Sequence, residues 1–228
     1  MVNKPTISVN KLGEYIISKG ARQRKILHDR KYPDPEFQMG MYHREASEAV
    51  ALYIAGGAID TSPLDKALRS LEQLTPDKIG TARRINSNID ALERFATMLD
   101  DIDLDGAEAE MGAHAPNKLT YHSVEISVRP EIILRATIKG KLHIGAMKFH
   151  FSKSHPHTTE SAGFVSAVVN EYCRVHIIGS GDGIVNPALC KVLDVASGTV
   201  FPGVKATKQR LADISAECQN IAALWPTI

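Results

Sequence analysis

Long hydrophobic runs are missing from this chain of 228 residues. A helix that crosses a membrane needs roughly 18 or more consecutive apolar residues, and no stretch of the sequence approaches that length. The first ten residues, MVNKPTISVN, also lack the apolar segment of a secretory signal peptide. The sequence therefore predicts neither a membrane span nor export, and we expect a cytoplasmic protein.

Cysteine is scarce, and an excess of charge of either sign is absent. The three cysteines, Cys173, Cys190 and Cys218, are far apart, and no C-x-x-C pair occurs. This spacing indicates neither a disulfide framework nor a zinc knuckle, so a reduced protein is the simpler interpretation. The net charge of +1 and the 43% hydrophobic content are those of a globular chain, with one domain or one domain and an appendage.

The first part of the chain has a helical pattern. Apolar residues recur at helical spacing from about residue 10 to residue 99, and Gly, Pro or capping residues end the segments. We expect Asn10 to cap the first helix and Ser62, followed by Pro63, to cap the fourth. The predicted helical segments are 10–20, 20–33, 44–57, 62–74 and 75–99.

The second part of the chain changes to a period of two. Residues 100–117 are acidic and rich in Gly, Ala and Pro, and we interpret them as a linker. Beyond the linker, β-branched and aromatic residues predict strands. The expected order is strands over 119–138 and 141–153, a helix over 159–177, a loop over 179–189, strands over 190–196 and 199–201, and a helix over 205–225. The sequence thus predicts an α+β fold, with a helical region 1–99, the linker 100–117, and a domain 118–228 with a mixed sheet and flanking helices.

The stretch PEIILRATIKGKLHIGAMKFHFSK places an acid and a lysine on neighbouring predicted strands. Glu131 follows a proline, which cannot donate to a strand ladder and indicates an edge or a bulge. On the second strand Ala146, Lys148 and His150 share one face, and the other face is apolar. We expect the apolar face to pack inward and the Ala-Lys-His face to point to solvent or to a site.

These residues, with the helix and strand that follow, resemble the core of the PD-(D/E)XK (restriction-endonuclease-like) superfamily over roughly residues 118–200. That family carries an acid after a strand and turn, and then acid-x-lysine on the next strand of an α-β-β-β-α-β core. Glu131 would match the first acid and Lys148 the lysine. The chain also looks like uncharacterised bacterial proteins that share a VRP-acid-L strand, a G-A-x-K strand and a final helix ending in Trp, a likeness that implies no activity.

The second acid of that motif is missing, because Ala146 stands in its place. The resemblance implies a Mg²⁺ site, and Mg²⁺ prefers a complete shell of oxygen ligands. Glu160 or Glu171 could replace the missing acid, so Glu131, Glu160 and Glu171 are the candidate metal ligands. An active metal-dependent nuclease, a degenerate site that only binds, and an ordinary hairpin are the three open interpretations.

The segment KGARQRKILHDRK, residues 19–31, carries six Lys or Arg against one Asp. On a helix these cations form a stripe that could contact several phosphates. Arg22, Arg24, Lys25 and Lys31 are therefore the candidate nucleic-acid contacts, with an ordinary solvated helix face as the alternative.

Three other motifs give weaker evidence for a functional site. DIDLDG (101–106) matches the first half of a calcium loop, but Gly112 stands where a bidentate Glu is required. His155 and His157 lack the further fixed ligands of a zinc site. GSGDG (179–183) is not followed by the Lys-Ser/Thr of a phosphate-binding loop, and it reads as a turn.

The sequence therefore predicts a nucleic-acid-associated protein with a degenerate or atypical nuclease-like core, acting in a bacterial or phage DNA-processing or defence system. Glu131 and Lys148 are the candidate catalytic residues, Mg²⁺ is a possible cofactor, and whether the chain is an enzyme stays open. The alternative is a non-catalytic protein-interaction component of a larger assembly, with the helix at 43–55 as contact surface. A buried, salt-bridged Lys148 would favour the alternative, and Lys148 in an acid-lined cleft would favour the nuclease-like site.

Overall fold

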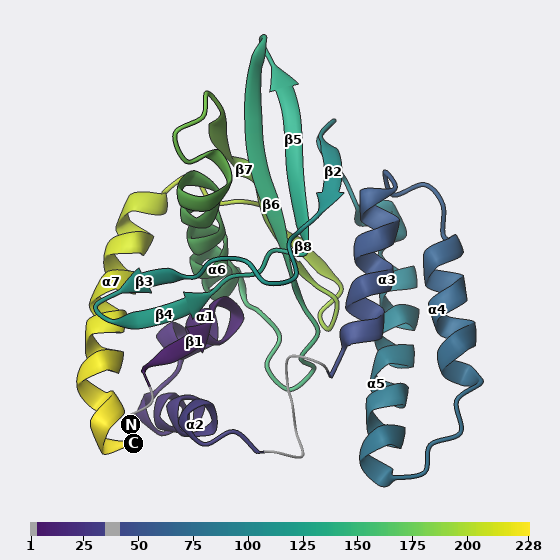
Figure 1. Cartoon of the computed structure of the whole chain (residues 1–228), viewed down its shortest axis with the longest axis horizontal. Helices are drawn as coiled ribbons and strands as arrows, with labels where there is room; N and C mark the ends of the chain where they lie inside the picture. The colour runs from purple at the N-terminus through teal and green to yellow at the C-terminus, as the bar shows by residue number, and fades with distance from the viewer. Residues whose placement is uncertain (1–3, 35–41) are drawn as a thin grey trace.

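The computed structural model describes residues 4–34 and 42–228, and these residues have the predicted α+β fold (Figure 1). Their strands form a five-stranded sheet of order β2-β5-β6-β7-β8 and a three-stranded sheet of order β1-β4-β3. In the larger sheet β7 is parallel to β6 and the other neighbours are antiparallel, so the predicted mixed sheet is present. The strands are β1 Thr6–Ser8, β2 Glu108–Met111, β3 Leu119–Tyr121, β4 Val124–Ser127, β5 Ile132–Ile138, β6 Lys141–His150, β7 Ile184–Asp194 and β8 Thr199–Phe201.

The predicted helices are present, although several of their first residues differ. They are α1 Val9–Ile17, α2 Gly20–Lys31, α3 Arg44–Ala55, α4 Ser62–Glu72, α5 Ile79–Ala96, α6 Thr159–Tyr172 and α7 Thr207–Leu224. Ser8 caps α1 by accepting a hydrogen bond from the Lys11 N–H, so the expectation that Asn10 is the cap was wrong. Thr61 rather than Ser62 occupies the cap position of α4, whose Pro63 still lies in the first turn. In the described residues no helix is both long and apolar enough to cross a membrane.

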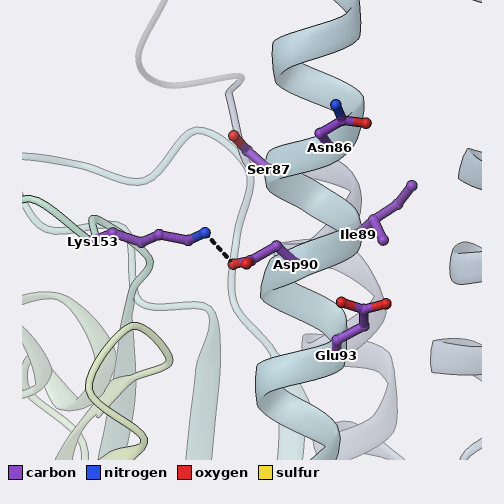
Figure 2. A pocket seen from close by; sticks show the side chains of 6 residues that line it. All are labelled: Asn86, Ser87, Ile89, Asp90, Glu93 and Lys153. Atoms are coloured by element: carbon purple, nitrogen blue, oxygen red, sulfur yellow. Dashed lines mark ion pairs between the residues drawn. The ribbon is translucent and has the colours of Figure 1, made fainter.

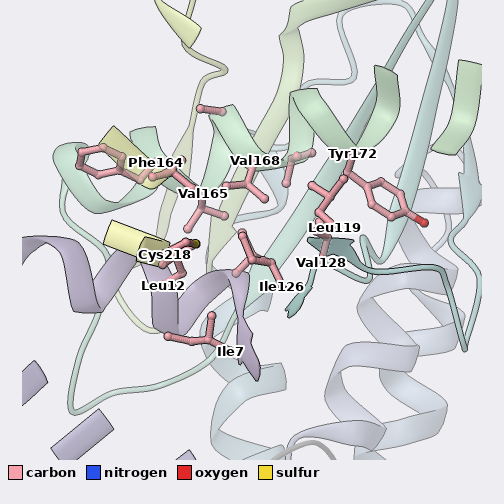
Figure 3. Close-up of a cluster of buried hydrophobic side chains, with 14 of the residues drawn as sticks. Ile7, Leu12, Leu119, Ile126, Val128, Phe164, Val165, Val168, Tyr172 and Cys218 are labelled. Atoms are coloured by element: carbon pink, nitrogen blue, oxygen red, sulfur yellow. The ribbon is translucent and has the colours of Figure 1, made fainter. Parts of the chain in front are cut away.

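Hydrophobic residues fill both faces of the five-stranded sheet. One face and the small sheet pack against α1, α2, α6 and α7. Figure 3 shows part of this cluster, which includes Ile7 and Leu12 as well as Val165 and Val168 of α6. The other face packs against α3, α4 and α5, which lie together on one side of the sheet (Figure 1). The central strands are therefore covered on both sides.

The division into a helical region 1–99 and a domain 118–228 does not coincide with this packing. β1 pairs in parallel with β4, where Ile7 lies opposite Ile126. α1 packs against α6 so closely that a Cβ on Gly13 would lie 2.9 Å from the Ser161 carbonyl oxygen. A local hydrophobic pattern shows that α1 must bury one face, but it does not show against which partner.

The acidic segment 100–117 is also part of the fold. Its residues Glu108–Met111 form the edge strand β2, paired with β5. The buried Lys191 of β7 donates to the Asp103 carbonyl oxygen at 2.6 Å, and its Nζ lies 2.6 Å from Asp105 Oδ2. The DIDLDG loop thus binds a lysine ammonium through one carbonyl oxygen and one carboxylate. These acidic residues therefore pack against the sheet, and the expectation of a solvated linker was wrong.

The β5–β6 hairpin forms as the sequence predicts. Lys139 and Gly140 both have positive φ and make a two-residue turn between Ile138 and Lys141. In β6 a register irregularity lies between Ile144 and Ala146. A Cβ on Gly145 would lie within 2.6 Å of Leu189 atoms, so only glycine allows β7 to approach here.

Candidate functional site

Glu131 and Lys148 meet at the start of β5, beside β6. Lys148 Nζ lies 2.5 Å from Glu131 Oε1 and donates to the Arg129 carbonyl oxygen at 3.0 Å. The second carboxylate oxygen of Glu131 accepts the Phe149 N–H at 2.7 Å. The side chains of Glu131 and Lys148 are 16% and 11% exposed. The structure thus brings the two predicted residues together as a closed, mostly buried ion pair.

The backbone of Phe149 explains why the pair forms at this point. β5 begins at Ile132, opposite Met147, so on the β5 side the following residues of β6 have no strand partner. Glu131 binds the Phe149 N–H, and Asn10 Nδ2 donates to the Phe149 carbonyl oxygen at 2.8 Å. Two side chains from distant parts of the chain therefore continue the hydrogen bonding that β5 no longer provides.

Asn10 and Glu14 of α1 extend the polar region. Asn10 Oδ1 is buried, and it accepts no hydrogen bond in the described residues. The Glu14 carboxylate is held by Lys11 at 2.6 Å and by the Arg22 guanidinium. Burial raises the pKa of Glu14, but Lys11 and Arg22 outweigh burial and hold that pKa below its ordinary value. Glu14 is thus an ionised link between α1 and α2.

Two buried histidines, His150 and His157, lie next to each other near the end of β6. The rings of His150 and His157 are 4.2 Å apart. His150 Nε2 contacts the His155 carbonyl oxygen at 2.8 Å, and His157 Nδ1 contacts Ser161 Oγ at 3.1 Å. The fully buried Asp194 accepts the His157 backbone N–H at 2.5 Å. Burial lowers the pKa of His157 to about 3 and lowers that of His150, although Asp194 opposes the second effect.

The Ala-Lys-His face of β6 is buried, because α1 and α6 cover it. Ala146 has no exposed surface, lies beside Ile133 and Cys190 in the strand register, and belongs to the hydrophobic cluster under α6. A carboxylate at this position would lose its hydration without gaining a hydrogen-bonded partner. The place of the missing acid is therefore a core position.

The candidate metal ligands Glu131, Glu160 and Glu171 are not assembled into one site. Glu160 is exposed in the first turn of α6, and Glu171 lies eleven residues later, about 16 Å along the helix axis. Glu171 instead pairs with Arg174 at 2.5 Å. Within residues 4–34 and 42–228 no group of three or more His, Cys, Asp or Glu side chains is placed to hold a metal ion.

The four cations predicted on α2 divide into two classes. Arg22 binds Glu14, and Lys31 donates to two backbone carbonyl oxygens in the last turn of the chain, at 2.7 and 2.9 Å. Arg24 and Lys25 are exposed, and Lys25 is 3.1 Å from Asp29. Arg22 and Lys31 therefore stabilise the fold, whereas Arg24 and Lys25 are accessible to a ligand.

The described surface includes two hollows that are lined by charged side chains. Figure 2 shows one of about 380 Å³ between α5 and the segment after β6, where Lys153 reaches Asp90 at 2.6 Å. Its lining residues are Asn86, Ser87, Ile89, Asp90, Glu93 and Lys153. The other, of about 290 Å³, lies between α2 and the last turn and is lined by Arg24, His28, Leu224, Thr227 and Ile228. Neither hollow includes Glu131 or Lys148.

Sequence reasoning did not assign Asn10, Glu14 or His157 to the site. Asn10 has the residue type and position of a helix cap, and Glu14 is one polar residue in an amphipathic helix. Asp194, in the strand before a Ser-Gly turn, supports the loop of His157 by accepting its backbone N–H. No local pattern separates these residues from ordinary surface groups, since only the packing of α1 on α6 places them over β6.

Neither a model of a known protein family nor a curated protein matches the chain.

Proposed function

We propose that this chain is a nucleic-acid-associated protein built on a degenerate nuclease-like core, and that it binds rather than cleaves. The proximity of Glu131 and Lys148, 2.5 Å apart, carries the nuclease-like part of the proposal, because the resemblance requires these two side chains to lie together. Their burial in a closed ion pair is the reason why we propose binding without cleavage. Within residues 118–200, β5, β6, α6 and β7 also follow one another in the order of the last four elements of the family's α-β-β-β-α-β core. By the same resemblance we place the chain in a bacterial or phage DNA-processing or defence system in the cytoplasm.

The residues present do not fit a Mg²⁺ site. Lys148 occupies one oxygen of Glu131 and the Phe149 N–H occupies the other, so the carboxylate has its hydrogen bonds already made. Among the residues that the structure describes, no group of three or more His, Cys, Asp or Glu side chains is placed to complete a shell, and Ala146 lies in the core. An ion held by one carboxylate would be poorly positioned, and a misplacement of about 1 Å can cost on the order of a hundredfold in rate.

The basic helix α2 is linked to this region through α1 and supports the binding part of the proposal. α2 is tied to α1 by the Arg22–Glu14 ion pair, and α1 is tied to β6 by Asn10. Arg24 and Lys25 lie on the exposed side of α2. Exposed Lys and Arg side chains contribute affinity for phosphates that weakens with salt.

The binding experiment measures the affinity for labelled DNA and RNA by fluorescence anisotropy across a range of salt. The double variant Arg24→Glu/Lys25→Glu should bind weakly, with a log–log salt slope smaller by about 2. The matched control is Lys205→Glu/Lys208→Glu, which reverses two exposed lysines near the start of α7. Equal binding by both double variants, or no binding by the parent chain, would contradict the proposal.

The cleavage experiment compares the parent chain with Glu131→Ala and Lys148→Ala in Mg²⁺ and in Mn²⁺, on duplex DNA, single-stranded DNA and RNA. We expect weak cleavage or none. Robust cleavage that both substitutions abolish would show that another group has replaced the missing acid, and would refute the binding-only proposal. Equal cleavage by all three proteins would indicate a contaminating nuclease.

A second candidate is a non-catalytic protein-interaction component. It is favoured by the burial of Lys148 and by its use in a closed salt bridge, which is the state of a structural residue. The helix proposed as its contact surface, α3, buries Ala46, Val50 and Ile54 in the core and exposes Leu52. Absence of nucleic-acid binding in the anisotropy experiment would favour this candidate.

A further inference from the structure

Two aromatic rings are exposed at the end of the basic helix α2. Tyr32, the residue after the helix, is 56% exposed, and the His28 side chain is 62% exposed. Their ring centroids are 5.2 Å apart at an interplanar angle of 51°, so the two aromatic rings lie next to each other at a tilt. Single exposed apolar side chains are common on proteins, but a pair of adjacent rings on a basic helix is a more specific arrangement.

A cation lies against the Tyr32 ring. Lys31 Nζ lies 5.6 Å from the centroid of the Tyr32 ring and 6.0 Å from that of Trp225. Its bonds to carbonyl oxygens of the last turn hold it in place, and the Tyr32 hydroxyl donates to the Ile228 carbonyl oxygen at 3.3 Å. Tyr32 is thereby fixed in orientation while one part of its ring surface stays accessible.

The candidate phosphate contacts, Arg24 and Lys25, lie on the same helix, about one turn before His28 and two turns before Tyr32. Arg24 and Lys25 are exposed, and the acid of α2, Asp29, is paired with Lys25 at 3.1 Å and lies 3.7 Å from His28. Exposed pairs of this kind contribute little stability, so Lys25 can exchange Asp29 for a phosphate at little cost. The helix therefore offers cations and rings in sequence along one surface.

The hollow of about 290 Å³ lies beside the rings. Arg24 and His28 form its polar side, Leu224 and Ile228 its apolar side, and Thr227 adds a hydroxyl group. A nucleobase has the matching chemistry, because it combines a flat apolar face with polar edges. A base that is paired inside a duplex does not present its face to such a hollow.

We infer that α2 and the last turn of the chain bind single-stranded nucleic acid, with unpaired bases stacked on Tyr32 and His28 and phosphates on Arg24 and Lys25. This inference rests on the proposed function and adds the class of substrate. Aromatic stacking of unpaired bases is the common means by which proteins hold single strands without sequence preference. An acidic peptide would satisfy the cations, but it would leave the rings without a partner.

The test titrates poly(dT), poly(rU) and a duplex of equal length, reading anisotropy and the emission of Trp225. Trp225 is the chain's single tryptophan and lies in the turn that lines the hollow, so its emission should change when a base enters. Single strands should bind more tightly than the duplex. Tyr32→Ala should lower single-strand affinity about tenfold or more, and Tyr32→Phe should keep most of it.

The salt dependence separates stacking from charge. Tyr32→Ala should weaken binding without changing the log–log slope, whereas Arg24→Glu should reduce the slope by about 1. Leu52→Ala on α3 is the matched control, because it truncates a half-exposed apolar side chain elsewhere. Binding that depends on Arg24 and Lys25, but is equal in Tyr32→Ala and Leu52→Ala or stronger for the duplex, would overturn this inference and leave the proposed function intact. No binding at all would overturn both.

Discussion

At the scale of single residues, the ion pair between Glu131 and Lys148 combines two functions. Removing two charges from water is costly unless their other hydrogen bonds are also made. Here the Phe149 N–H and the Arg129 carbonyl oxygen supply those bonds. The pair therefore satisfies a backbone N–H of β6 beyond the β5 pairing and fixes the start of β5, with or without a bound ligand.

Breaking this pair should destabilise the fold more than breaking an exposed one. Lys148→Met leaves Glu131 mostly buried without its cation, and we expect a loss of about 3 kcal/mol in the free energy of unfolding. The double variant Glu131→Gln/Lys148→Met should lose less than the sum of its single variants, because no uncompensated charge is left. Urea unfolding measures both effects.

The control for this prediction is Arg44→Ala, which removes the exposed pair of Arg44 with Glu48 on α3. An exposed pair of this kind contributes little, so the urea midpoint should hardly change. Equal losses for Lys148→Met and Arg44→Ala would show that Lys148 is solvated rather than structural.

At the scale of elements, the close contact between α1 and α6 positions the polar region. Gly13 lies against the Ser161 backbone and Val165, and this contact holds Asn10 and Glu14 over the end of β6. A larger residue at position 13 would separate the two helices. The glycine is therefore required by packing, despite its poor helix propensity.

Two glycine substitutions in helices should have opposite effects. Gly13→Ala places a methyl group 2.9 Å from the Ser161 carbonyl oxygen and should destabilise the fold by about 1–3 kcal/mol. Gly80→Ala, in the first turn of α5, meets no atom within 4 Å and should stabilise it by up to about 1 kcal/mol. Thermal unfolding of the two variants measures the signs, and a stabilised Gly13→Ala would contradict the close packing of α1 on α6.

The loop between β6 and α6, which contains His155 and His157, should make the free energy of unfolding depend on pH. An unfolded histidine binds a proton near pH 6.5, whereas burial lowers the pKa of folded His157 to about 3. The unfolded state therefore binds more protons between these values, and stability falls as pH drops from about 6.5 towards 3, by at most about 1.4 kcal/mol per pH unit for this group.

Urea midpoints of the parent chain and of His157→Gln, measured between these pH values, test the effect. Carboxylates such as Glu14 and Glu125, whose pKa values are held low by nearby lysines or arginine, also destabilise the fold in acid, so the difference between the two proteins is the quantity to compare. This difference should shrink as pH falls. A constant difference would mean that His157 is not buried in its neutral form.

At the scale of the whole molecule, one sheet connects two hydrophobic clusters. β5, β6 and β7 contribute residues to both clusters, with Ile133 on one face and Ile132 on the other. Lys153 and Asp90 add an ion pair between α5 and the segment after β6 (Figure 2). Neither cluster can form completely without the shared strands, so the two layers should fold together.

The fragments 1–99 and 118–228 should therefore not fold independently. The first lacks the strands that cover α3 and α5, and the second lacks β1, α1 and β2. In the full chain, urea unfolding followed by Trp225 emission and by far-ultraviolet circular dichroism should give coincident transitions. Cooperative unfolding of fragment 118–228 alone would contradict this prediction.

The sequence by itself determined the local structure. Periodicity gave the helices to within a few residues, although the expected caps Asn10 and Ser62 are not the capping residues. The Lys139–Gly140 turn with its flanking alternation gave the β5–β6 hairpin. The parity of strand residues also placed Lys148 and His150 on one face. These features depend on interactions within a few residues, so a single sequence contains them.

Only the tertiary structure decided what lies over that face. Asn10 and Glu14 reach the site from more than a hundred residues away, through contacts that leave no periodic signal in the chain. The same packing buried Ala146, paired Lys148 with Glu131 and turned Arg22 and Lys31 inward, while Arg24 and Lys25 stayed exposed. A side chain's charge can be read from the sequence, but its partner and its exposure depend on which distant helix packs against its strand.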